Sequence, residues 1–139
     1  MILSTVETTQ PKGWLVGPWN SPVPIPVGYA NEGINELHYH AEMYEIYLIA
    51  KGESTALVNE QEVHLRAGHM LVVEPHEVHT FIHSSPDYLH FVLQAPFVAN
   101  DKHSVTSKRS IAEIFAPFQG KAIFYEDPNT PTTDEWSEV

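Results

Sequence analysis

Short strand-like segments that follow one another at close intervals constrain this chain more than any other feature. They are rich in Val, Ile, Leu, Tyr and Phe, and glycine, proline or polar turn residues separate them. The segments are 34–40, 44–50, 54–58, 62–66, 70–73, 78–83 and 88–95. This spacing leaves no room for the helices that connect parallel strands. The pattern therefore predicts an all-β fold, an antiparallel sandwich or barrel.

The flanking segments are less regular, and the length of 139 residues fits one domain. Residues 1–32 hold five prolines, which exclude a long helix and predict an extended arm or edge strands. Residues 33–95 are the predicted barrel core, and residues 96–139 a C-terminal extension. Within that extension we expect a short helix over 108–116 and an acidic, exposed tail that Trp136 holds against the domain.

The charge and composition of the chain exclude several classes of partner. Eighteen acidic residues against seven Lys and Arg give a formal net charge of −11, which disfavours nucleic acid and anionic membranes. No cysteine is present, so thiolate metal sites and disulfides are excluded. The N-terminus resembles no secretory signal and no apolar run is long enough to span a membrane, which predicts a cytoplasmic protein.

The stretch LHYHAEMYEIYLIAKG, residues 37–52, contains two histidines and a glutamate among apolar residues. Side chains two apart on a strand share a face, so His38 and His40 point the same way. Glu45 and Tyr47 share a face of the next segment, and the intervening residues supply a turn. Alone, a His-x-His pair is more often an exposed polar face, and a lone glutamate an edge residue or the partner of a cation.

A second stretch, GHMLVVEPHEVHTFIH at residues 68–83, changes that balance. By strand alternation, His79, Phe81 and His83 share one face. Three imidazoles and one carboxylate from separate strands form a suitable shell for a divalent transition metal, and ligation removes the cost of burying the carboxylate. Such a shell leaves positions open for water, substrate or dioxygen.

These two stretches resemble the two sequence motifs of the cupins. The first matches at Gly33, His38, His40, Glu45 and Gly52, and the second at Gly68 and His79. The departures are the position of Gly33, one residue closer to the first histidine than usual, and three replacements in the second motif, Glu74 for proline, His76 for glycine and His83 for asparagine. The resemblance implies a jelly-roll barrel of two antiparallel sheets. It also implies that His38, His40, Glu45 and His79 are metal ligands.

Other residues near the predicted site have two readings each. His83 either lines the pocket as an acid–base group or is a packed, hydrogen-bonded core residue. Tyr47 either contacts the substrate or packs in the core, and these two are our candidates for catalytic residues. His90 is a candidate pocket wall, whereas His64 is expected to face solvent.

Two classes of function fit these observations. The first is an enzyme that uses Fe, Mn, Ni, Co or Zn on a small oxygen-bearing substrate, with dioxygenase-type chemistry first and isomerase or lyase chemistry second. The second is a noncatalytic module that senses or stores a metal or a small ligand. The length leaves no room for an appended DNA-binding domain, which favours the enzyme. We also expect a homodimer, because the arm and the sheet edges need covering.

Overall fold

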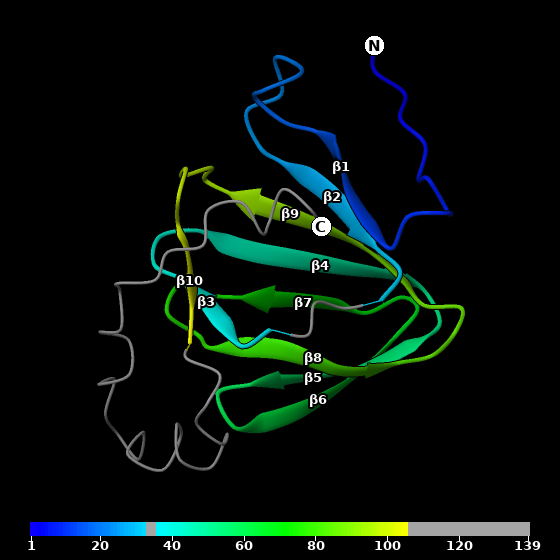
Figure 1. The fold of residues 1–139 in the computed structure, drawn as a ribbon, viewed down its shortest axis with the longest axis vertical. Helices are drawn as coiled ribbons and strands as arrows, with labels where there is room; N and C mark the ends of the chain where they lie inside the picture. Colours follow the sequence, from blue (N-terminus) through cyan, green and yellow to red (C-terminus); the bar gives the residue numbers. More distant parts are fainter. Residues whose placement is uncertain (33–35, 106–139) are drawn as a thin grey trace.

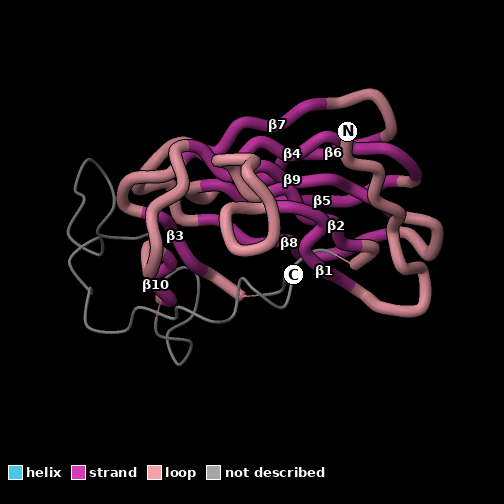
Figure 2. The backbone as a smooth tube through the Cα atoms, turned by 90° about the horizontal axis from the view of Figure 1, so that it is seen from above, coloured by secondary structure: helices cyan, strands magenta, loops and turns pink. Residues whose placement is uncertain are grey.

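The structure is a computed structural model that describes residues 1–32 and 36–105. These residues form ten strands joined by loops, and none of them is helical (Figures 1 and 2). The strands are β1 (Lys12–Val16), β2 (Val27–Ala30), β3 (His38–His40), β4 (Tyr44–Lys51), β5 (Glu53–Val58), β6 (Gln61–Arg66), β7 (Met70–Val73), β8 (His79–Ser84), β9 (Leu89–Ala95) and β10 (Lys102–Ser104). No helix able to cross a membrane occurs in this described part of the chain.

The strands form two antiparallel sheets of five. One sheet has the order β1-β2-β9-β4-β7 and the other β10-β3-β8-β5-β6. In Figure 1 the first sheet runs from β1 and β2 at the top of the view to β7, with β8, β5 and β6 of the second sheet below it. Most strands that are neighbours in space are distant in sequence, as β2 and β9 are, which is the connectivity of a jelly roll. The predicted all-β jelly-roll fold is confirmed.

The seven predicted segments correspond to β3 through β9. The N-terminal region forms β1 and β2 at an edge of the first sheet, and the hydroxyl of Tyr29 donates a hydrogen bond to the Glu7 carbonyl (3.1 Å), which ties the preceding residues to the barrel. Sequence reasoning missed β10, which pairs with β3. The predicted helix at 108–116 and the contact of Trp136 lie outside the described residues.

The core lies between the two sheets and follows from strand alternation. On β4, Tyr47 and Ile49 are buried and point inward with Glu45, whereas Leu48 between them is 40% exposed. Phe81 of β8 and Val92 of β9 pack against them in the same buried cluster. The interior is therefore apolar and aromatic around Tyr47, and polar where Glu45 lies.

Two glycines occupy turns between strands: Gly52 lies between β4 and β5, and Gly68 lies between β6 and β7. Gly52 has φ +73° and Gly68 has φ +96°, a region that side chains disfavour. At Gly52 an added Cβ would also lie 2.8 Å from the Tyr88 Cα atom, whereas at Gly68 it would meet nothing within 4 Å. Gly52 is therefore required by both conformation and space, and Gly68 by conformation alone.

Candidate metal centre

The Glu45 carboxylate lies at the centre of a group of three histidines. Its Oε1 atom is 2.9 Å from His79 Nε2 and 3.9 Å from His38 Nε2, and its Oε2 atom is 3.2 Å from His40 Nε2. All four side chains are buried, with at most 2% of any residue exposed. The structure thus brings together the four residues that the motifs predict as ligands.

The two sheets contribute different members of this group. His38 and His40 flank Tyr39 on β3, whose buried side chain lies on the other face of the strand, and His38 pairs directly with His79 of the adjacent β8. Glu45 comes from β4 in the opposite sheet. The Ala41–Met43 loop, which connects β3 to β4, sets the separation between the histidine pair and the carboxylate.

Backbone carbonyls fix the orientation of two of the imidazoles. His38 Nδ1 is 2.7 Å from the Glu36 carbonyl oxygen, and His79 Nδ1 is 2.9 Å from the Glu77 carbonyl oxygen. A carbonyl only accepts, so each Nδ1 carries a proton; Nε2 of a protonated ring then donates to Glu45, whereas Nε2 of a neutral ring has a lone pair for a metal ion. A lone pair facing a carboxylate oxygen is stable only with a proton or a metal ion between them. His38 Nε2 has no hydrogen-bond partner among the described residues, which fits a metal ligand.

The spacing of these atoms also fits a metal ion. His38, Glu45 and His79 each offer a ligand atom within 4.8 Å of the others. Bonds of about 2.1 Å to one ion place pairs of ligand atoms about 3–4 Å apart. His40 stands beside this trio and reaches it through its contact with the second oxygen of Glu45. The arrangement can hold a divalent ion through two or three imidazoles and one carboxylate.

Electrostatics favour an ionised Glu45 and a neutral His38. Burial alone would raise the pKa of Glu45, but His40 and His79 hold that pKa well below its usual range through charge and hydrogen bonding. Burial lowers the pKa of His38 well below its usual value, and the neighbouring His79 and Lys102 charges lower it further. These are the protonation states that metal ligation requires.

Two side chains of the first sheet hold the Glu45 carboxylate in place. Tyr47 donates its hydroxyl proton to Oε1 at 2.9 Å, and Gln94 of β9 donates an amide proton to Oε2 at 3.2 Å. Burial and the Glu45 charge raise the pKa of Tyr47 well above its usual value, so its hydroxyl stays protonated. Tyr47 therefore touches a candidate ligand, and its contact with Glu45 is one of orientation.

Asp101 determines the shape of the loop between His40 and Glu45. Its carboxylate accepts backbone hydrogen bonds from Ala41 (3.1 Å), Glu42 (2.9 Å) and Met43 (2.9 Å). The Asp101 residue is only 5% exposed. Three donors on one buried carboxylate fix the loop that places the candidate ligands. Sequence reasoning did not find Asp101, because it lies in an irregular segment.

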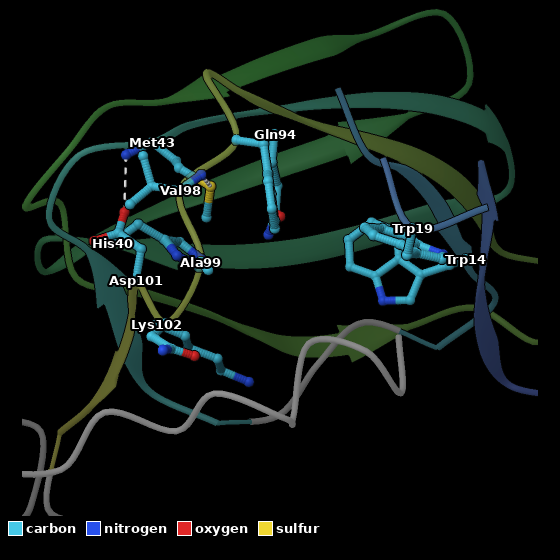
Figure 3. Close-up of a pocket in the computed structure, with 11 residues that line it drawn as sticks. Trp14, Trp19, His40, Met43, Gln94, Val98, Ala99, Asp101 and Lys102 are labelled. Atoms are coloured by element: carbon cyan, nitrogen blue, oxygen red, sulfur yellow. Dashed lines mark hydrogen bonds between the residues drawn. The ribbon is translucent and has the colours of Figure 1, made fainter. Parts of the chain in front are cut away.

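A pocket of about 440 Å³ leads from this group to the surface. Its inner wall includes His40 and Gln94, which contact Glu45, together with the buried Lys102. Its outer wall includes Trp14 and Trp19 (Figure 3). A small molecule in the pocket would therefore reach the candidate centre past His40.

His83 does not lie where strand alternation predicts. The pairing of β5 with β8 shifts by one residue, so that Thr55 opposes His83 while the adjacent Ala56 opposes Phe81. Ile82 is the extra residue of this bulge, which reverses the facing of the side chains that follow. His83 is consequently exposed and lines surface pockets on the second sheet, and the expected shared face with His79 is wrong.

Three other histidines lie away from this group. His64 is exposed, as expected. His90 is 1% exposed, and its Nδ1 lies 2.6 Å from the Tyr88 hydroxyl in the core. Burial lowers the pKa of His90 to about 3. His76, at a motif position usually held by glycine, has φ +72°, the conformation that glycine adopts most readily.

Comparison with known proteins agrees with this geometry. A family model described as the AraC-like ligand binding domain matches residues 22–112. No curated protein matches the chain.

Among solved structures, Pac13 of Streptomyces, described as a nucleoside dehydratase, is 19% identical with a TM-score of 0.55, covering 69% of this chain and 79% of its own. A cupin 2 conserved barrel domain protein of Salinispora arenicola is 11% identical with a TM-score of 0.54, covering 68% and 87%. KdgF of Halomonas is 16% identical with a TM-score of 0.50, covering 63% and 78%. Similarity at this level indicates a common fold.

Proposed function

We propose that this chain, which belongs to the cupin superfamily and within it to the family of AraC-like ligand-binding domains, is a metal-dependent enzyme. In this proposal it acts on a small oxygen-bearing molecule. One observation carries this proposal. A fully buried carboxylate, Glu45, is surrounded by imidazole Nε2 atoms, and one of these imidazoles, His40, lines a pocket that opens to the surface. Perturbed, buried titratable groups at the base of a pocket mark candidate catalytic sites.

His38, His40, Glu45 and His79 would hold the ion in this proposal. A divalent transition metal there supplies Lewis-acid polarisation of a substrate oxygen and, if it is redox-active, reaction with dioxygen. The protein residues orient this centre: Tyr47 and Gln94 fix both oxygens of Glu45, and backbone carbonyls fix two imidazoles. Tyr47 is thus proposed as a positioning residue, and its hydroxyl stays protonated at neutral pH.

Metal content of purified variants tests the ligand assignment. His79→Ala should abolish stoichiometric metal retention, because it removes an Nε2 atom that lies 2.9 Å from Glu45 Oε1. His64→Ala is the matched control, since His64 is exposed and lies outside the group. Elemental analysis after identical purification measures both proteins. Equal metal content in the two variants would contradict the assignment.

Oxygen uptake separates the reaction classes. Protein loaded anaerobically with Fe(II) is mixed with small diketones, catechols and aromatic acids in an oxygen electrode. Substrate-dependent uptake supports dioxygenase chemistry, our first choice. Stoichiometric metal with product formation but no oxygen uptake supports isomerase or lyase chemistry. Pac13, described as a nucleoside dehydratase, belongs to the lyase class.

A noncatalytic ligand sensor is the second candidate function, and the match to the AraC-like ligand binding domain favours it. A sensor binds its ligand and returns it unchanged. Recovery of every bound small molecule unaltered after incubation with metal-loaded protein would favour the sensor.

We also keep the prediction of a homodimer. Large apolar side chains on the outer face of β4 and β7 are exposed, among them Leu48 (40%), Met70 (62%) and Val72 (40%). Pairing with a second copy would remove part of this surface from water. Light scattering on the purified protein measures the mass, and a monomer at micromolar concentration would contradict the prediction.

A further inference from the structure

The outer wall of the pocket is aromatic. The Trp14 and Trp19 ring centroids are 5.3 Å apart, and those of Trp19 and Phe97 are 6.1 Å apart, both pairs edge-on. Trp19 and Phe97 remain 50% and 39% exposed. They therefore offer ring surface to a ligand in the pocket.

The backbone holds the Trp19 ring in position. The ring lies over Gly17, where an added Cβ would approach it to 2.3 Å. The turn that carries Trp19 is closed by hydrogen bonds between Gly17 and Asn20, including one from the Gly17 amide to Asn20 Oδ1 at 3.0 Å. Trp19 is thus a fixed surface, which lowers the entropic cost of stacking a ligand on it.

The inner wall carries a buried cation. Lys102 is 2% exposed, lines the pocket, and lies opposite His40 in the register between β10 and β3. Its Nζ atom is 3.1 Å from Glu36 Oε1. In Figure 3 its side chain extends from β10 below the space between His40 and the two tryptophans. In a protein of net charge −11, this ammonium attracts an anion that contacts it directly, against the pairing with Glu36 and the Asp101 carboxylate that lines the same pocket.

We propose that the pocket selects small planar anions, specifically aromatic carboxylates, whose ring stacks on Trp19 and Phe97 while the carboxylate lies near Lys102. This inference rests on the proposed function for the position of the ligand, since it takes the pocket to be the route to the Glu45 group. The distribution of chemistry along the pocket supports it, with aromatic rings outside and the ammonium inside. Glu36 competes with the ligand for the ammonium.

Three probes separate the two parts of the recognition. 2-Naphthoate has the ring and the charge, 2-naphthamide has the ring alone, and cyclohexanecarboxylate has the charge alone. Calorimetry should show 2-naphthoate binding at least about tenfold more tightly than 2-naphthamide, which lacks the charge-assisted contact, and more tightly than cyclohexanecarboxylate, which lacks the stacked ring. Equal affinity for 2-naphthoate and 2-naphthamide would overturn the proposal.

Variants then assign the selectivity to residues. Lys102→Met should weaken 2-naphthoate about tenfold and leave 2-naphthamide unchanged, whereas Lys102→Arg should keep the preference. Glu36→Gln should strengthen 2-naphthoate, because it removes the competing carboxylate. Trp19→Ala should weaken both naphthalene probes and spare cyclohexanecarboxylate. The ratio between probes is measured within one preparation, so a partly folded variant still gives a valid answer. A preserved ratio in Lys102→Met would refute the role of Lys102.

The same experiment on metal-free protein distinguishes this inference from the proposed function. Lys102 and Trp19 are not candidate ligands, so the preference should persist after dialysis against a chelator. Stoichiometric metal without a preference for 2-naphthoate overturns the inference and leaves the proposed function standing. Preference for 2-naphthoate in a protein that never retains metal supports the inference and overturns the proposed function.

Discussion

Replacing Asp101 by Asn tests how far the candidate centre depends on a residue outside it. The aspartate carboxylate accepts three backbone hydrogen bonds of 2.9–3.1 Å from the loop between His40 and Glu45. An asparagine side chain has one accepting oxygen, and its NH₂ group would face a backbone N–H donor. At least one buried donor therefore loses its partner, and the remaining contacts lose the contribution of the charge.

The magnitude follows from the contacts that are lost. A buried donor left without a partner costs about 1–3 kcal/mol, and a neutral acceptor contributes roughly half as much as a charged one. We therefore expect Asp101→Asn to lower the free energy of unfolding by about 2–4 kcal/mol. A domain of this size typically has about 5–15 kcal/mol, so the variant should still fold at 25 °C.

Urea unfolding followed by circular dichroism measures this change, with the slope against urea serving as the check on two-state behaviour. Glu42→Gln is the matched control, because it removes one carboxylate from the same loop at an exposed side chain. The affinity for metal should fall in Asp101→Asn and stay constant in the control. Stability of Asp101→Asn within about 0.5 kcal/mol of the parent protein would refute the reasoning.

Three further predictions concern other parts of the barrel. The folded protein holds His90 neutral with a pKa of about 3, so between pH 6.5 and pH 3 this residue binds fewer protons in the folded state than in the unfolded state. Its contribution to the free energy of unfolding is therefore complete above about pH 6.5 and is lost toward pH 3, at about 1.4 kcal/mol per pH unit. In urea unfolding at a series of pH values, the free energy of unfolding of His90→Gln should fall less steeply with acid than that of the parent protein, and identical slopes would contradict this. Gly52→Ala should destabilise the protein by more than Gly68→Ala, which is expected to cost about 1 kcal/mol from conformation alone, and equal losses in melting experiments would argue against the crowding at Gly52. Tyr47→Phe should weaken metal binding about tenfold or more through the lost hydrogen bond to Glu45, as measured by competition with a chelator, and unchanged affinity would exclude its positioning role.

Local alternation was sufficient to predict much of the candidate site. His38 and His40 lie two residues apart on one strand, as do Glu45 and Tyr47, and a strand places such pairs on one face wherever it pairs. Gln94 follows from the same rule, since it shares the buried face of β9 with His90. The alternation of apolar residues with turns likewise predicted β3 through β9.

Features that depend on pairing between distant strands could not be predicted in this way. The bulge at Ile82 turns His83 outward, and nothing in the sequence of β8 marks the extra residue. Asp101 acts on a loop that precedes it by 58 to 60 residues, and Lys102 enters the pocket only because β10 pairs with β3. Neither residue belongs to a periodic segment, so no local pattern identifies them.

The position of Glu45 opposite the histidines has a mechanical consequence. Apolar contacts between two sheets tolerate small sliding movements, because dispersion forces have little directionality, whereas hydrogen bonds to a carboxylate depend on distance and angle. One residue of β4 thus adds a directional contact between the two layers at this end of the barrel, to His79 of β8. Loss of the Glu45 carboxylate would therefore remove a directional link between the two layers as well as a candidate metal ligand.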